Sequence, residues 1–407
     1  MTAHPPGPLD GVRVVDLTSI VMGPLATQIF GDLGADVITV EDPRGTLSRV
    51  MTAGPRPGLS GVALNLLRNK RNMVLDLKSE EGREALLEVT ATADVMVTNL
   101  RPGTLARLRL TYDDVVSVRP DIVYCQAQGY PSDSDAADAP AYDDVIQAAT
   151  GLPDAFRRFG GEPLFAPTLM ADKVSGLTIA YAVLAALLHR ERTGEGQRIE
   201  IPMVDVMTAF MLVEHAGAAT ARPPQGPPGY QRILNSERRP QRTRDGWISV
   251  LPYTRQNFEE IFRAGDREDL AVDERIATAR GRIDHADDLY REVATILGRR
   301  TTAEWLEFCL SAGVPASPIP TLDQLVDDLD EDDHPVAGRY KVIPQPVRFS
   351  RMSGPTVRRP AALSGQHTDE VLAEVRGTGR ATSAGHRAGG SDVDHHDHDH
   401  GEGAGPR

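Results

Sequence analysis

The sequence contains only two cysteines in 407 residues, and other common signals are missing as well. Cys125 and Cys309 are too few for a disulfide framework, and no C-x-x-C pair suggests a zinc site. The opening residues, MTAHPPGPLDGVRVVDL, lack the basic and apolar segments of a signal peptide. The longest apolar run, 177–188, is too short to span a bilayer and predicts a buried core helix. These absences favour a reducing, cytoplasmic setting without a membrane partner.

Positive charge is also scarce, because 44 lysines and arginines face 58 aspartates and glutamates, which gives a net charge of −14. Nucleic-acid binding needs a basic face, so this balance argues against such a partner. A phosphate-rich ligand would need the few cations to cluster in one cleft. Two basic groups flank neighbouring predicted strands: Arg68, Lys70, Arg71 and Lys78, then Arg101 and Arg107. They form either a solvated charged face or a set of phosphate contacts.

Short apolar runs alternate with amphipathic stretches in the first half of the chain. Between the predicted strands lie helices from Pro24 to Gly34 and from Ser79 to Ala93. Alternating strands and helices predict an α/β fold with a parallel, doubly wound sheet. The predicted strands are 12–17, 35–41, 72–77, 94–99 and 121–129.

The second half of the chain is divided by the Pro- and Gly-rich segment RPPQGPPGY, which is typical of a linker. Beyond it, helices predicted at 256–263, 284–297 and 302–312 suggest a smaller α+β domain. The expected organisation is a large domain over 1–221, a linker over 222–230, a small domain over 231–320, a return to the large domain over 321–376, and a tail over 377–407.

The expected tail is rich in Gly, Ala, His and Asp and has almost no large apolar residue. Such a composition cannot bury enough surface to order itself. Its DHHDHDH run, at 394–400, could bind a divalent metal, but a solvated tail is the favoured interpretation and we expect no metal site.

Two common catalytic motifs are missing. The turn after the first strand, TSIVMGP (18–24), lacks the G-x-G-x-x-G that brings a backbone close to pyrophosphate, so NAD binding with Glu41 on the ribose is not expected. The helix N-terminus after Gly23 could still receive an anionic or carbonyl group. No G-x-S-x-G occurs, and Cys125, in a predicted buried strand, is interpreted as structural.

Asp172 lies in LMADKVSGL, where an irregular segment meets an apolar helix expected to reach Arg192. The residue suits the N-cap of that helix. A carboxylate at a loop–helix junction is also oriented and partly exposed, as a nucleophile must be. The two interpretations are compatible.

Several long motifs are shared with a known family. They include LDGVRVVDLTSIVMGPLATQIFGDLGADVITVE, NKRNMVLDLKSEEGREALLEVTATADVMVTNLRPGTLARLRLTYDDV, PAYDDVIQAATGL, ADKVSGLTIAYAVLAALLHRERTGEGQRIEIPMVDVM and GVPASPIPTLDQLVDD. With these motifs the chain resembles the class III CoA-transferases from Leu9 to about Glu374, a family that includes formyl-CoA:oxalate and carnitine CoA-transferases and α-methylacyl-CoA racemases. The resemblance implies a large doubly wound domain with an inserted small domain, and an interlocked homodimer. It also implies acyl-CoA and carboxylic acid substrates, with no permanently bound cofactor.

The resemblance gives Asp172 the role of the catalytic aspartate. Its carboxylate would attack the donor thioester to form an anhydride, and the CoA thiolate would then give an aspartyl-CoA thioester for the acceptor acid to attack. Tyr142 matches a family tyrosine near the thioester, and Asp143 matches the polar residue after it. Residues that match CoA contacts or lie beside the path of the nucleotide are Arg44, Leu75, Lys78, Asn99 and Arg107.

The chain departs from the family pattern where substrate specificity is set. Val21 stands where formyl-CoA transferases carry a glutamine, and Ser19 stands where they carry a histidine. Residues 235–247 replace their Gly-rich loop, so oxalate is not the expected acceptor. Three arginines of this segment could receive a dicarboxylate: Arg238, Arg239 and Arg242.

Two alternatives to CoA transfer stay open. An α-methylacyl-CoA racemase needs two proton-transfer groups, typically a His and an Asp. Tyr142 stands in the position of that His, and a phenol is a poor base at neutral pH, which favours transfer over racemisation. A non-catalytic acyl-CoA-binding protein would have no need for Asp172.

Overall fold

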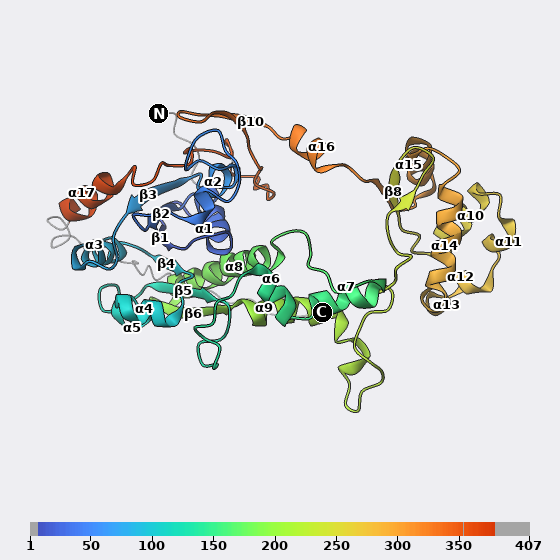
Figure 1. Cartoon of the computed structure of the whole chain (residues 1–407), viewed down its shortest axis with the longest axis horizontal. Coiled ribbons are helices and arrows are strands. Elements are labelled where there is room, and N and C mark those ends of the chain that lie inside the picture. Colours follow the sequence, from blue (N-terminus) through green and yellow to red (C-terminus); the bar gives the residue numbers. More distant parts are fainter. Residues whose placement is uncertain (1–6, 353, 379–407) are drawn as a thin grey trace, which may run out of the picture.

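The computed structural model describes residues 7–352 and 354–378 as two bodies joined by two connecting segments (Figure 1). The larger body contains a six-stranded sheet in the order β3-β2-β1-β4-β5-β6, and each neighbouring pair is parallel. The predicted α/β class with a parallel sheet is confirmed. The strands are β1 (Arg13–Leu17), β2 (Asp36–Glu41), β3 (Lys70–Val74), β4 (Val95–Thr98), β5 (Val123–Gln128) and β6 (Gln197–Pro202).

Helices cover both faces of this sheet. One face carries α1 (Met22–Asp32), α8 (Met170–Thr193) and α9 (Met203–His215). The other carries α3 (Glu80–Thr90), α4 (Pro102–Leu108), α5 (Tyr112–Val116) and α17 (Thr368–Thr378). Shorter elements of the chain before residue 220 are η1 (Leu47–Arg49), α2 (Gly61–Leu66), α6 (Asp143–Ala149), α7 (Leu152–Gly160) and η2 (Gly217–Ala219).

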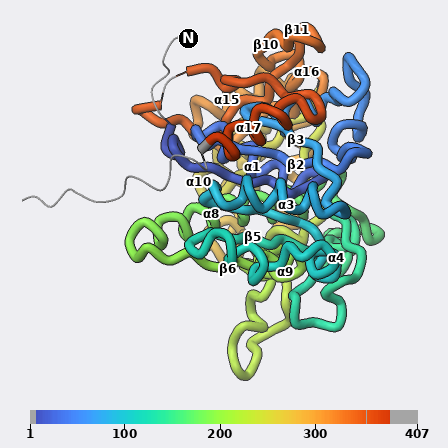
Figure 2. Tube along the Cα trace, turned by 90° about the vertical axis from the view of Figure 1, so that its left-hand side faces the viewer, coloured from blue at the N-terminus to red at the C-terminus, as the bar shows by residue number. Residues whose placement is uncertain are grey.

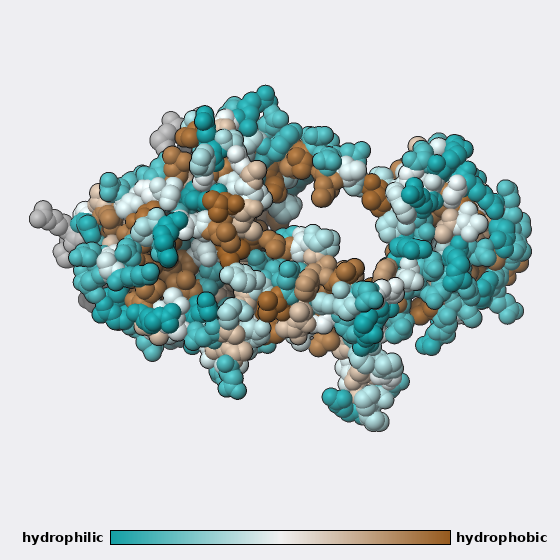
Figure 3. Space-filling view, viewed as in Figure 1, coloured by the Kyte–Doolittle hydropathy of each residue, from teal (hydrophilic) through white to brown (hydrophobic). Residues whose placement is uncertain are grey.

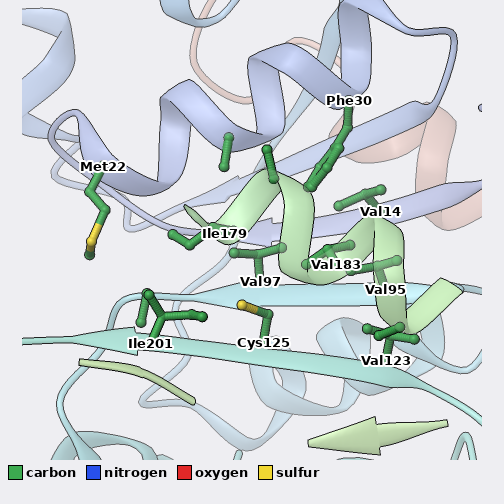
Figure 4. Packing of buried hydrophobic residues seen from close by; sticks show 14 of the residues in the cluster. Val14, Met22, Phe30, Val95, Val97, Val123, Cys125, Ile179, Val183 and Ile201 are labelled. Atoms are coloured by element: carbon green, nitrogen blue, oxygen red, sulfur yellow. The ribbon is translucent and has the colours of Figure 1, made fainter. Parts of the chain in front are cut away.

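The core between α1, α8 and the sheet is densely apolar. Phe30 of α1 and Val183 of α8 join Val97 and Cys125 of the strands in one buried cluster (Figure 4). Burial of a Val or Phe side chain contributes about 1.5–3 kcal/mol, so the cluster fixes α8 on the sheet. Burial also raises the pKa of the Cys125 thiol to about 12, as expected of a structural cysteine.

Several local predictions hold closely. Ser79 is the N-cap of α3, and its hydroxyl accepts the backbone N–H of Gly82 at 3.0 Å. The strand β3 differs, because it begins at Lys70 and ends at Val74, whereas the apolar pattern predicted 72–77. Charged residues occupy its first two positions, and apolar periodicity cannot recognise such residues as strand positions.

Three of the four members of the first basic group fit neither interpretation, and Lys78 is the exception. Arg68, Lys70 and Arg71 have side chains that are at most 6% exposed, so they form neither a solvated face nor phosphate contacts. Each is neutralised by an aspartate, as buried charges require, and burial lowers the pKa of the Lys70 ammonium. The pairs are Arg68–Asp32 at 2.7 Å, Lys70–Asp16 at 3.1 Å and Arg71–Asp36 at 2.5 Å.

The second body has a core of its own, formed by residues between 248 and 314. Trp305 is fully buried there and donates its indole N–H to the carbonyl of Leu297 at 2.8 Å. The strands are β7 (Gln241–Arg242), β8 (Trp247–Val250) and β9 (Ala316–Pro318). The helices are α10 (Arg255–Ala264), α11 (Glu268–Ala271), α12 (Glu274–Ala277), α13 (Ala279–Asp284), α14 (Ala286–Leu297) and α15 (Thr302–Ala312).

The chain then returns to the larger body through α16 (Leu322–Asp327), β10 (Glu331–His334) and β11 (Gly338–Lys341). Its last helix, α17, packs beside β3 and α3 (Figure 2). The two bodies and their two connections enclose an open passage, which the space-filling view shows directly (Figure 3). Residues after α17, including the DHHDHDH run, lie outside the described residues.

The helix α8 is longer and less covered than the predicted core helix. Within the described residues it alone is long and apolar enough to span a membrane by length and composition, with a mean hydropathy of 1.5 over its most apolar window. Of that window 44% is buried, and Ile179 and Val183 face the core. Leu177 and Tyr181 lie on its uncovered side and are more than half exposed.

Candidate active site

A cavity of about 650 Å³ lies where strands β1 to β4 end. In the sheet order, β1 and β4 are the neighbours from which the chain runs outward in both directions. Open α/β sheets bind ligands at the carboxyl ends of strands beside such a point. The cavity is lined by all five residues that the sequence predicted for CoA contact: Arg44, Leu75, Lys78, Asn99 and Arg107.

The cations around this cavity differ in how firmly they are engaged. Arg44 is exposed, and its Nε donates to Asp42 at 2.7 Å, which holds the pKa of that carboxyl below its usual value. Lys78 is exposed, and Arg107 donates to the hydroxyl of its neighbour Thr104 at 3.0 Å. A polyphosphate would therefore meet two cations, Lys78 and Arg107, that form no close ion pair with a carboxylate among the described residues.

Two further arginines line the cavity and were not predicted. Arg83 of α3 and Arg109, which ends α4 in a left-handed conformation, both pair with Glu80. Arg83 was hidden in the sequence as one more charged position of an amphipathic helix. Arg109 reaches the cavity only because α4 ends there, which no spacing rule indicates.

Arg101, which the sequence grouped with Arg107, does not line this cavity. It precedes α4 and donates to the carbonyl of Asp138 at 3.1 Å. Its predicted role as a phosphate contact has no support from this arrangement.

The turn from β1 to α1 forms one wall of the cavity, since Thr18 and Ser19 line it. The Asn99 side chain engages this turn on both sides, because its Oδ1 accepts the backbone N–H of Ser19 at 3.1 Å and its Nδ2 donates to the Ser19 carbonyl at 2.9 Å. Ile20 has a φ of +74°. A β-branched residue in that region stores about 1–3 kcal/mol of strain, which surrounding contacts must hold.

Asp172 lies in the first turn of α8 and is only 8% exposed. It is not the N-cap, as the sequence suggested, because α8 already begins at Met170 and the N-cap position is Leu169, which makes no side-chain cap. The cap comes from another helix. The carboxylate of Asp143, at the start of α6, accepts the backbone N–H of Asp172 at 2.9 Å.

The environment of Asp172 makes its carboxyl a weak acid. Burial, followed by repulsion from Asp143, raises its pKa to about 6. At neutral pH the group is still mainly a carboxylate, and it is a stronger base and nucleophile than an ordinary aspartate.

Asp143 is itself fixed by neighbours. Its second carboxylate oxygen accepts from the side-chain amide of Gln147, whose Oε1 accepts the backbone N–H of Ala166 at 2.9 Å. Tyr142, directly before it, is 63% exposed and points to the surface. The structure therefore joins Asp143 to Asp172 by a hydrogen bond and leaves Tyr142 uncovered beside them.

The cavity and Asp172 are connected through α1. Three residues after Ser19, the carbonyl of Met22 lies so close to α8 that a Cβ on Gly176 would meet it at 2.7 Å. Gly176 is one helical turn beyond Asp172. The same short segment thus borders the cavity at one end and packs against the helix of Asp172 at the other.

The residues proposed for other ligands are engaged elsewhere. Glu41, the ribose ligand of a dinucleotide site, is buried and pairs with Arg49 at 2.8 Å. Arg242 stacks over Trp247 at 4.5 Å in the smaller body. Among residues 7–352 and 354–378, no group of three His, Cys, Asp or Glu side chains forms a candidate metal site.

The chain is similar to known proteins over most of its length. The model of CoA-transferase family III matches residues 9–368. The probable fatty acyl-CoA transferase Rv3272 of Mycobacterium tuberculosis is 32% identical over 91% of this chain and 99% of its own length. The human succinyl-CoA:glutarate CoA-transferase is 29% identical over 93% of this chain and 89% of its own length.

Solved structures agree with this likeness. The orthorhombic form of Rv3272 has a TM-score of 0.75 at 31% identity and covers 90% of this chain and 99% of its own. A CaiB/BaiF family protein from Brucella suis has a TM-score of 0.77 at 26% identity, with 91% and 100% covered.

Proposed function

The chain belongs to CoA-transferase family III, and from this membership we propose that it moves CoA reversibly from an acyl-CoA donor to a free carboxylic acid, with Asp172 as the nucleophile. The observation that carries the proposal is the buried Asp172 carboxylate, whose pKa is raised to about 6. Its helix packs against Met22, which follows the cavity-lining residues Thr18 and Ser19 in the same segment. Among the relatives are succinyl-CoA:glutarate CoA-transferases and a succinyl-CoA:mesaconate CoA-transferase. Succinyl-CoA is therefore the first donor to test.

The proposed reaction keeps the thioester energy in covalent bonds. Asp172 attacks the donor thioester, so that the acyl group forms a mixed anhydride with it and CoA leaves as a thiolate. The thiolate then attacks the aspartyl carbonyl, which releases the donor acid and forms an aspartyl-CoA thioester. The acceptor carboxylate attacks this thioester and gives a new anhydride and CoA thiolate. Attack of the thiolate on the acceptor acyl carbonyl yields the new acyl-CoA and frees Asp172.

The cavity is the proposed site for the nucleotide end of CoA. The pyrophosphate and 3′-phosphate are anions that need clustered cations. Three cations line this one cavity: Arg44, Lys78 and Arg107. Leu75 supplies apolar surface, and Asn99 fixes the adjoining turn. We propose no permanently bound cofactor and no metal for this chemistry.

Asp143 supports the reaction by holding the first turn of α8 and by keeping Asp172 basic. Tyr142 is uncovered next to it and is available to a bound acyl group. The racemase alternative is less well supported, because the relatives named above are transferases and Tyr142 occupies the position of the racemase histidine.

An interlocked homodimer is part of the proposal. The passage between the two bodies is open through the molecule in the space-filling view (Figure 3). The helix α16, on one of the connections, leaves Leu322, Leu325 and Val326 about half exposed or more. Exposed apolar groups at such a passage favour burial against a second copy. Light scattering of the purified protein should give twice the chain mass, and a monomer would contradict this part of the proposal.

The decisive experiment is a CoA exchange assay in the full chain. Succinyl-CoA is incubated with a panel of mono- and dicarboxylic acids, including glutarate, and new acyl-CoA is measured by mass. Hydroxylamine should trap an adduct on Asp172 during turnover. Normal exchange by Asp172→Ala would refute the mechanism. Deuterium exchange at the α-carbon of a 2-methylacyl-CoA, without CoA transfer, would support a racemase instead.

We also propose a cytoplasmic location for the protein, which fractionation of the native cells tests.

A further inference from the structure

The strained turn from β1 to α1 is held by several side-chain hydrogen bonds from other segments. Asn99 binds the backbone of Ser19 through both atoms of its amide, at 3.1 and 2.9 Å. The hydroxyl of Ser48, which is fully buried, donates to the Ile20 carbonyl at 2.6 Å. These bonds keep Ile20 at a φ of +74°. Overdetermined strain of this kind points to a required backbone shape.

A third group that holds the turn is Asp16 of β1. The buried carboxylate of Asp16 accepts both the hydroxyl of Thr18 and its backbone N–H. Lys70 neutralises Asp16 at 3.1 Å. Gly23 leaves the room for this arrangement, because a Cβ there would lie 2.3 Å from the Thr18 side chain. The turn is therefore fixed at each of its first three residues.

The turn lies between the cavity and the helix that carries Asp172, so its rigidity can fix their relative positions. At its start it lines the cavity through Ser19, and at its end the carbonyl of Met22 contacts α8 next to Gly176. A change in the shape of the turn would move the cavity wall relative to Asp172. The thioester of a bound acyl-CoA must meet this carboxylate within bonding reach, and errors of about 1 Å can cost about 100-fold in rate.

We propose that Asn99 and Ser48 are positioning residues of the transfer reaction, which set the distance between bound CoA and Asp172 by clamping the turn at Ser19 and Ile20. The inference rests on the proposed function and refines it, since Asn99 was predicted only as a contact of CoA. Its amide is already engaged on both sides with Ser19. Its loss should therefore lower the rate of transfer more than the affinity for CoA.

The test separates rate from affinity in four variants of the full chain. Ser48→Ala and Ile20→Gly are decisive, because neither residue lines the cavity. Glycine at position 20 adopts positive φ freely but loosens the turn. We expect each variant to lower kcat with succinyl-CoA and glutarate about tenfold or more, while calorimetry with free CoA gives a Kd within twofold of wild type. Asn99→Ala should lower kcat similarly, and Ser48→Thr should restore it.

The matched control is Ser117→Ala. Its hydroxyl also donates to a backbone carbonyl at 2.6 Å, but after α5 and away from the cavity. Unchanged kcat in Ser48→Ala and Ile20→Gly, or an Asn99→Ala variant that loses only CoA affinity, would overturn the inference and leave the proposed function intact. If Ser48→Ala does not fold, Ile20→Gly decides alone. A wild-type protein that transfers no CoA would refute the proposed function and this inference together.

Discussion

The carboxylate of Asp143 accepts the backbone N–H of Asp172 at 2.9 Å, so one aspartate caps the helix that carries the other. The cap orients the first turn of α8, and its charge disfavours ionisation of the neighbouring carboxyl. A single side chain thus influences both the geometry and the basicity of Asp172. The first three predictions follow from this pair.

Replacing Asp172 by Asn should abolish CoA transfer while preserving the fold. The amide has nearly the same shape but cannot form an anhydride, so we expect kcat to fall by about 1,000-fold or more. Initial rates with succinyl-CoA and glutarate measure this change. The control is Asp144→Asn, because Asp144 directly follows Asp143 but is exposed, and this variant should keep full activity.

Asp172→Asn should also stabilise the protein at neutral pH. The pKa of Asp172 rises from 3.8 to about 6 on folding, so the folded state binds the proton more tightly. The resulting penalty develops as pH rises from about 4 to 6 and is complete above 6. Asn removes a cost of about 3 kcal/mol. Thermal melts should show a higher Tm for the variant at pH 7.5 and little difference at pH 4, and the opposite pattern would contradict the raised pKa.

The pH profile of transfer should depend on Asp143. In the wild type, kcat/KM should rise with pH and level off above about 6, because the nucleophile is the carboxylate form of Asp172. Asp143→Asn keeps an oxygen for the Asp172 N–H but removes the repelling charge, so the ascending limb should move to lower pH. An unmoved limb would show that burial alone sets the pKa.

CoA affinity should depend on the cations that line the cavity. Lys78→Ala and Arg107→Ala should each weaken CoA binding about tenfold, which corresponds to about 1.4 kcal/mol. The losses should shrink as salt is added, because exposed charges are screened. Arg101→Ala is the control, since Arg101 lies outside the lining. Calorimetric titration at two ionic strengths distinguishes these outcomes.

The buried pair of Lys70 and Asp16 should be far more important for stability than an exposed lysine. Lys70→Met leaves the Asp16 carboxylate without its cation in the core, which should cost about 3–5 kcal/mol. Lys78→Met, on the exposed connection after β3, should change stability by less than about 0.5 kcal/mol. Urea unfolding followed by circular dichroism compares the two variants.

Periodicity and caps predicted much of the fold because they depend on residues that are close in sequence. The Ser79 cap and the limits of α15 needed only a few neighbouring side chains. The charged start of β3 was misread because the partners of Lys70 and Arg71 are Asp16 and Asp36, which lie on other strands. A sequence displays a charge but not the distant group that neutralises it.

The candidate site shows the same division. Family resemblance led to residues that line one cavity, including Lys78 and Asn99. The cap of Asp172 by Asp143 was not foreseen, because it joins two helices whose approach depends on the packing of the whole sheet. Arg83 was missed because nothing in an amphipathic helix tells which charged position faces a ligand.

The return of the chain to its own first half has a mechanical consequence. Non-covalent packing of the returning chain closes the passage in Figure 3: β11 packs against Leu59 and Leu64, and α17 packs against β3 and α3. A polypeptide threaded through it can leave only after that latch peels away or one chain unravels. Release would then be governed by the barrier to unfolding rather than by the strength of the contacts inside the passage. In the proposed interlocked homodimer, differently tagged copies mixed after synthesis should therefore exchange on the timescale of global unfolding.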